Sequence, residues 1–239
     1  MTYPCDTAFR LLNAAHRLDA TQEKYMITSS RMERTTALTD LFLCFLAVYI
    51  LLQFTGAPGF KFQLWVWAFA FLAGAAFLGF VVHWFAMTEK AVGVTWIFLR
   101  LCLGLGFGFI VAAAVYDLNG EPAARQSLPW ALSVIVLNLA VIVLAPSRLR
   151  GHIVFLYQLL SMLFALAIFG IYIFLVVAGS LRGAGWIVSG MAVTLAGGVV
   201  QAVGRKGNPI FWSFDSNGMF HLIQMAGLIL IMIGLKSSM

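Results

Sequence analysis

The sequence predicts an all-α protein, a polytopic membrane protein built as a bundle of seven transmembrane helices. Of its 239 residues, 62% are hydrophobic and only 10% are charged, whereas soluble domains carry about 25% charged residues. The mean hydropathy of +0.95 is typical of helices that are apolar on all sides and therefore face lipid.

Seven apolar runs are long enough to cross a bilayer core of about 30 Å, which takes about 20 helical residues. They are Thr36–Phe54, Phe62–Met87, Ala91–Tyr116, Leu128–Ala145, His152–Gly179, Gly183–Val203 and Met219–Leu235. The two longest connections, Asp117–Ser127 and Gly204–Gly218, hold turn residues and no further domain. We therefore expect one transmembrane domain over residues 36–239. The polar residues 1–35 form either an interfacial helix or a frayed cytoplasmic leader.

The distribution of Lys and Arg predicts the orientation of the bundle. Ten of the 15 basic residues flank the runs on the side of the N-terminus, four lie on the other side, and Arg100 lies inside a run. Because basic loops stay in the cytoplasm, this predicts a cytoplasmic N-terminus and an extracytoplasmic C-terminus. The positive charge follows topology and forms no basic stripe interleaved with aromatics, so no nucleic-acid partner is expected. The three cysteines include no CxxC pair, which argues against a disulfide framework or a thiolate metal site.

Polar residues inside the apolar runs gather in the half of the bilayer that we predict to be cytoplasmic. Such residues are costly in lipid, and they commonly mark functional sites. They are Asp40, His83, Arg100, His152, Gln201, Asn217, His221 and Gln224. The opposite half has almost nothing comparable, so the pattern predicts a polar cavity open to the cytoplasm. Two alternatives remain: helix-end residues solvated at the interface, and a structural ion pair between Asp40 and Arg100.

The start of the last run carries the most closely spaced polar residues. Asn217 and His221 are four residues apart and share a helix face, with Gln224 three residues further on. Asp215 or Ser216 is placed to cap the helix, and a cap is the favoured role for Asp215 over a ligand. His83 and His221 could form a metal pair, with Asp40, Asp215 or His152 as the third ligand of a zinc ion.

These residues resemble those of a known group. Seven helices, a His near the cytoplasmic end of the second and NGMFH opening the seventh are similar to the CREST superfamily, which includes alkaline ceramidases and the progestin and adipoQ receptors. The segments TALTD at Thr36–Asp40 and DSNGMFHLIQMAGL at Asp215–Leu228, with Gln201, look like an uncharacterised bacterial seven-helix family. The resemblance implies a bacterial inner-membrane location.

The CREST pattern also implies zinc held by three histidines and hydrolysis of a lipid amide. His83 and His221 match two of those ligands, but Asn217 stands where the third His is expected. Gly79 replaces the expected Ser of the second helix, and the Asp of the third helix has no clear match. The match therefore covers two of the three metal ligands.

Two functions follow, and we rank them in this order. The first is a non-catalytic membrane subunit or receptor-like protein with a cytoplasmic-side polar cavity, whose partners are membrane lipids or a membrane protein. The second is a metal-dependent intramembrane hydrolase of a lipid amide or ester, in which His83 and His221 bind the metal and Asp40 or Asp215 is the third ligand or general base. A transporter ranks last, because no line of polar residues crosses both leaflets.

Overall fold

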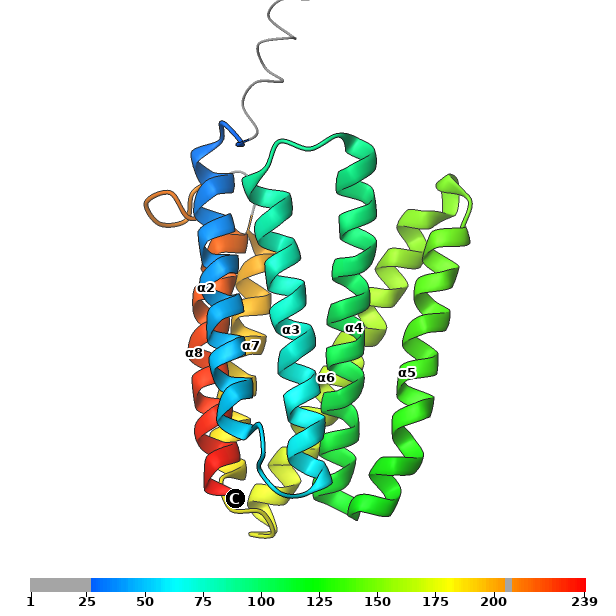
Figure 1. Ribbon diagram of the computed structural model, residues 1–239, viewed down its shortest axis with the longest axis vertical. Coiled ribbons are helices and arrows are strands. Elements are labelled where there is room, and N and C mark those ends of the chain that lie inside the picture. The colour runs from blue at the N-terminus through cyan, green and yellow to red at the C-terminus, as the bar shows by residue number, and fades with distance from the viewer. Residues whose placement is uncertain (1–26, 205–207) are drawn as a thin grey trace, which may run out of the picture.

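Figure 1 shows the computed structural model, which describes residues 27–204 and 208–239. That part of the chain contains helices and two isolated β-bridges but no strand. The helices are α2 (Arg31–Phe54), α3 (Phe60–Trp84), α4 (Glu89–Asn119), α5 (Glu121–Leu144), α6 (Ser147–Val177), α7 (Ala184–Val203) and α8 (Ser216–Ser237). The predicted all-α bundle of seven helices is confirmed.

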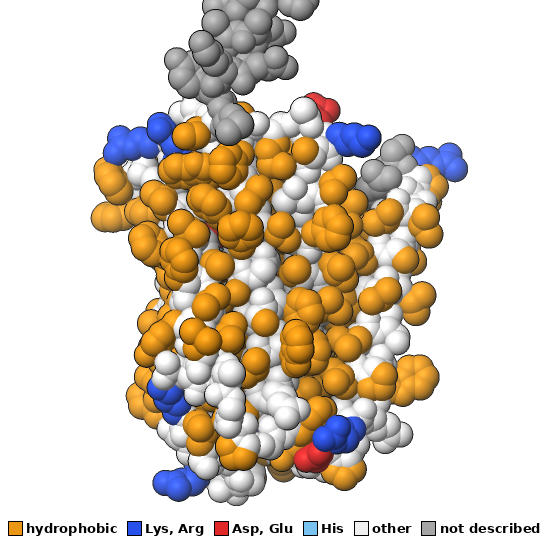
Figure 2. Space-filling model, viewed as in Figure 1, with side chains coloured by type: hydrophobic (Ala, Val, Ile, Leu, Met, Phe, Trp, Pro, Cys, Tyr) orange, Lys and Arg blue, Asp and Glu red, His pale blue; other side chains and the backbone are white. Residues whose placement is uncertain are grey.

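All seven helices are long and apolar enough to cross a membrane. Hydrophobic side chains cover the waist of the molecule, and most charged side chains visible in Figure 2 lie near its two ends. This distribution indicates an integral membrane protein. We call the end of the bundle where α2 begins the N-side, and the end where α8 finishes the C-side (Figure 1). The charge count predicts that the N-side is cytoplasmic.

Six helices close into a ring. The chain-adjacent helices α2, α3 and α4 pack in order, α7 packs most extensively on α8, and α8 packs on α2. α6 joins α7 to α4 and so completes the ring, while α5 packs mainly on α4 and only slightly on α6. The ring brings the first two helices next to the last one, and this juxtaposition assembles the candidate site.

Several helices begin earlier than the apolar runs do. α2 begins at Arg31, because the Ser30 side chain caps it by accepting from the Glu33 N–H. α5 begins at Glu121, where the expected long loop is reduced to Gly120 with a φ of 84°. Polar residues extend these helices beyond the part that faces lipid. Hydropathy identifies only the apolar part of a helix, whereas capping residues mark where the helix begins.

Glycines allow α7 and α8 to pack backbone against backbone. A Cβ added at Gly190 would lie 2.4 Å from the Gly227 carbonyl oxygen, and one at Gly234 would lie 2.7 Å from the Gly183 carbonyl oxygen. Small residues at such interfaces let membrane helices approach closely, so that many weak contacts add up. This close pairing fixes α8 along its length.

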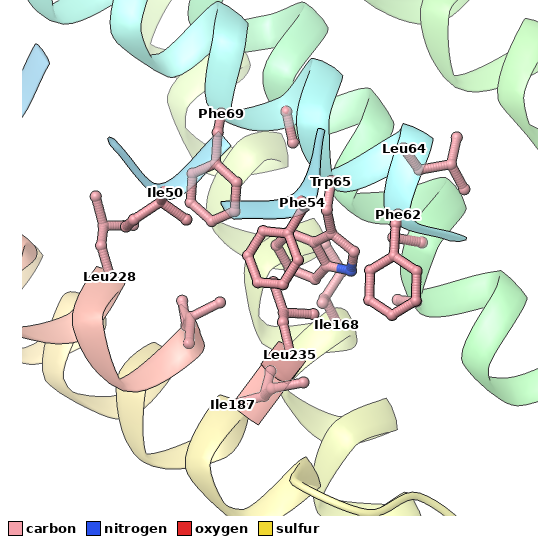
Figure 3. Close-up of a cluster of buried hydrophobic side chains, with 14 of the residues drawn as sticks. Ile50, Phe54, Phe62, Leu64, Trp65, Phe69, Ile168, Ile187, Leu228 and Leu235 are labelled. Atoms are coloured by element: carbon pink, nitrogen blue, oxygen red, sulfur yellow. The ribbon is translucent and has the colours of Figure 1, made fainter. Parts of the chain in front are cut away.

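The apolar core fills the C-side half of the ring. Ile50 and Phe54 of α2, Trp65 of α3 and Leu235 of α8 are at most 2% exposed. In Figure 3 Phe54, Trp65 and Leu235 lie together, and Ile50 lies beside Phe69. The Phe54 and Phe62 rings stack with their centroids 5.8 Å apart. The N-side half of the same ring is where the buried polar side chains gather.

Candidate functional site

Buried polar side chains from three helices meet at the N-side of the ring. We call them the N-side cluster; its buried members are Thr36, Thr39, Asp40, His83, Asp215, Ser216 and His221. All of them are at most 7% exposed. Burial of this many polar groups is costly unless they bind one another or a ligand.

Two threonines of α2 attach this helix to α8. The Thr36 hydroxyl donates to Asp215 Oδ1 over 3.2 Å. Asp215 also caps α8, because the same oxygen accepts from the Asn217 and Gly218 N–H groups at 3.1 and 3.0 Å. The favoured cap role of Asp215 is therefore confirmed, and three donors already occupy its Oδ1 atom.

The His221 ring lies between Thr39 and Asp40. Its Nδ1 atom is 3.1 Å from Thr39 Oγ1 and 3.4 Å from Asp40 Oδ1. The Thr39 hydroxyl donates its proton to the Thr36 carbonyl oxygen over 2.7 Å, so Nδ1 is the donor toward Thr39. This tautomer leaves Nε2 of His221 as a lone-pair acceptor.

Asp40 lies against the glycine of α3 that replaces the expected serine. A Cβ at Gly79 would lie 2.8–2.9 Å from the Asp40 carboxylate, so no larger residue fits without moving that group. The Oδ2 atom of Asp40 is buried and has no hydrogen-bond partner among the described residues. A buried carboxylate oxygen without a donor is rare in folded proteins, and it marks the centre of the cluster.

Side chains at the edge of the N-side cluster contact both ring nitrogens of His83. Its Nδ1 atom contacts Glu33 Oε2, and because a carboxylate can only accept, Nδ1 carries the proton. Its Nε2 atom lies 3.5 Å from Asn217 Nδ2, which can donate to it. Gln201 donates to Asn217 Oδ1 over 2.5 Å, and the His83 and Trp96 rings meet edge to face.

In both histidines, the Nδ1 atom donates to an oxygen, and the Nε2 atom therefore carries the lone pair. This orientation is typical of metal-binding histidines, whose second nitrogen donates to a carboxylate, carbonyl or other acceptor. The described residues, however, include no group of three His, Cys, Asp or Glu side chains placed to hold a metal. The zinc ion implied by the resemblance therefore stays a prediction.

The remaining predicted site residues lie at the edge of the cluster or away from it. Gln201 is exposed and reaches the cluster only through Asn217. His152 is exposed on α6, which in the described part of the chain packs mainly on α7, α4 and α5. Arg100 is partly buried, with its guanidinium 6.0 Å from the Trp96 ring centroid. The alternative of an ion pair between Asp40 and Arg100 is not found among the described residues, where the side chain beside Asp40 Oδ1 is His221.

A small apolar cavity lies inside the ring, next to the cluster. Its volume is about 210 Å³, and residues of α3, α4, α6, α7 and α8 line it. Gln224, one turn beyond His221, contributes to its wall, and so does Trp65, whose buried indole N–H has no partner among the described residues. A dry cavity of about 150 Å³ can hold a benzene ring, so this one accommodates a short apolar group.

The C-side also holds buried charged residues, which lie just outside the apolar runs. On the C-side, Lys61 Nζ and Asp117 Oδ1 form a buried ion pair at 2.7 Å. Tyr172 donates to Asp117 Oδ2 over 2.9 Å, and Lys61 donates to Ser238 Oγ over 3.1 Å. Both charged residues lie near helix ends, where side chains are commonly solvated, but here Tyr172 of α6 contacts Asp117 and Ser238 contacts Lys61.

Sequence reasoning also missed Thr36, Thr39 and Glu33 as members of the site. The available signal was the spacing of Thr36, Thr39 and Asp40, which places three polar residues on one face of an apolar helix.

Comparison with known proteins gives a family but no activity. A family model described as "Family of unknown function (DUF6962)" matches residues 35–239. Neither a curated protein nor a solved structure matches the chain significantly.

Proposed function

Since the chain belongs to the DUF6962 family, which has no assigned function, we propose a role from the site itself: a receptor-like membrane protein that binds a small amphiphile. The polar end of this ligand lies in the N-side cluster, and its apolar end enters the central cavity. This proposal rests on the Oδ2 atom of Asp40, which is buried and has no hydrogen-bond partner among the described residues.

The unpaired atoms define the chemistry of the ligand. As part of a carboxylate, Asp40 Oδ2 accepts from an O–H or N–H donor. The Nε2 atom of His221 is an acceptor as well, whereas His83 Nε2 already faces the Asn217 amide. The cavity one turn away is lined mostly by apolar side chains. A hydroxyl- or amide-bearing lipid fragment combines a donor with an apolar body, and its partners would be membrane lipids or a membrane protein that supplies such a group.

The test compares two carboxylate-to-amide changes. The protein is purified in mild detergent, bound small molecules are extracted, and mass spectrometry identifies and counts them. We expect wild type to retain a donor-bearing amphiphile near one per chain, Asp40→Asn to lose it, and Asp117→Asn to keep it. Asp117 is the matched control, because it is equally buried but belongs to the C-side ion pair. Equal retention by both variants, or an empty wild-type protein, contradicts the proposal.

A second candidate is a metal-dependent hydrolase of a lipid amide or ester. It is favoured by the two oriented histidines and by Gly79, which leaves room for a carboxylate beside them. His83, His221 and Asp40 would be the ligands, a donor set whose chemistry suits zinc. Because three donors do not gather in the described residues, we derive no catalytic step.

Metal analysis decides between the two candidates. Protein purified without chelators is analysed for zinc as wild type, His221→Ala and His152→Ala. If the protein is a metal-dependent hydrolase, the wild type should contain about one zinc per chain. The His221→Ala variant should then lose this zinc, and the His152→Ala variant should keep it. The receptor-like reading expects no stoichiometric metal in any of the three.

A further inference from the structure

A second and larger hollow lies outside the ring, between α4, α5 and α6. Its volume is about 830 Å³. Its lining on α5 runs from Ala123 to Asn138, sixteen residues whose fifteen rises of about 1.5 Å span about 22 Å. Most of the lining is apolar, and Trp130 and Val134 are half or more exposed at its rim. We call it the α4–α5 groove. It exists because α5 packs on α4 but only slightly on α6.

Arg100 belongs to the helix face that lines this groove. Gly104, Gly108 and Val111 of α4 line it, and Arg100 precedes them by four, eight and eleven residues, a spacing that keeps all four on one face. Arg100 therefore stands at the N-side end of the groove, one turn beyond the lining. It makes no ion pair among the described residues.

The depth of this cation matters. The Arg100 backbone lies four residues from the middle of α4, which is about 6 Å. Its guanidinium extends toward the N-side, where it lies 6.0 Å from the ring of Trp96. That places the charge near the boundary between hydrocarbon and headgroups, since half of a core of about 30 Å is about 15 Å. A cation there that forms no ion pair with a described residue is expected to bind a lipid anion.

We propose that the α4–α5 groove binds one anionic phospholipid of the N-side leaflet, with its phosphate on Arg100 and one acyl chain in the groove. Counted from the middle of α5, the lining extends about 8 Å toward the N-side, to Asn138, and about 14 Å toward the C-side, to Ala123. A chain that descends from Arg100 therefore enters the groove near Asn138 and follows it past the middle of the bilayer. Lys90 and Arg148, exposed at the N-side starts of α4 and α6, add positive charge on the same side. Basic pockets between membrane helices bind anionic headgroups in this manner. This site is separate from the N-side cluster and does not depend on its function.

The experiment uses the full chain in nanodiscs made of equal parts phosphatidylcholine and phosphatidylglycerol. Native mass spectrometry counts the lipids that remain on the released protein. We expect one retained lipid, with phosphatidylglycerol preferred roughly fivefold, the ratio that corresponds to about 1 kcal/mol per Arg near the membrane surface. Arg100→Gln should remove the preference, and Arg100→Lys should keep part of it. Arg182→Gln, at an exposed site on the C-side, should change nothing.

A second pair of variants tests whether the groove binds the acyl chain. This pair tests the proposal even if the Arg100→Gln variant does not fold. Val134 lines the rim and is 50% exposed, whereas Val136 is 53% exposed and does not line the groove. Val134→Trp should lower the count of retained lipid at least several-fold, and Val136→Trp should not. Equal retention of both lipids by wild type, an unchanged preference in Arg100→Gln, or matched effects of the two Trp variants overturns the proposal. A wild-type dimer that Val134→Trp dissociates also overturns it, since a second copy would then fill the groove.

Discussion

Replacing Lys61 by Met tests whether the C-side ion pair holds the ring together. The pair joins α3 to α4, and its partners Tyr172 and Ser238 add α6 and α8. The Lys61 and Asp117 side chains are 8% and 2% exposed. Among the described residues, removal of the ammonium leaves the buried Asp117 carboxylate with the Tyr172 hydroxyl as its remaining donor. Loss of one partner from a buried pair costs about 3–5 kcal/mol.

The free energy of unfolding is measured by titration with a denaturing detergent in mixed micelles. Tyr172→Phe removes one hydrogen bond to a charged group, so it should cost about 1.5–3 kcal/mol and less than Lys61→Met. The control, Lys236→Met, removes an exposed lysine that donates to Gln53, and it should cost less than about 1 kcal/mol.

The double variant Lys61→Met, Asp117→Leu separates burial of charge from loss of packing. It removes both charges together, and replacement of a whole buried ion pair by apolar residues is often nearly neutral. We therefore expect it to be more stable than Lys61→Met alone. A Lys61→Met protein within about 1 kcal/mol of wild type, or a double variant whose loss equals the sum of the single losses, would refute this account of the network.

Three further predictions concern the ring and its orientation. Gly79→Ala should displace the Asp40 carboxylate and cost about 1–3 kcal/mol in the same titration, as overpacking does, whereas Gly198→Ala, with open space around its Cβ position, should be neutral. Gly190→Ala should cost more than Gly198→Ala, because its Cβ would lie 2.4 Å from a backbone oxygen of α8; equal stability of the two would show that α7 and α8 can separate freely. A reporter fused after Met239 should be active only outside the cytoplasm, and cytoplasmic activity would reverse the orientation predicted from the basic residues.

The sequence by itself determined the seven helices, because burial of apolar side chains in lipid is a property of each segment separately. It also located most of the polar residues of the N-side cluster, since a His or Asp within an apolar run is conspicuous without knowledge of its neighbours. The cap at Asp215 could be predicted for the same reason, because a cap involves only residues next to it in the chain.

Only the tertiary structure decided which of these residues meet. Asp40 faces His221 and not Arg100, because α8 packs on α2 and the glycine at position 79 leaves space for the carboxylate. Lys61 and Asp117 are buried and not solvated, because α6 brings Tyr172 against the end of α4. Pairings of this kind depend on the order in which helices close the ring and on the closeness of their backbones. Hydropathy and spacing report on each helix alone, so they cannot supply that order.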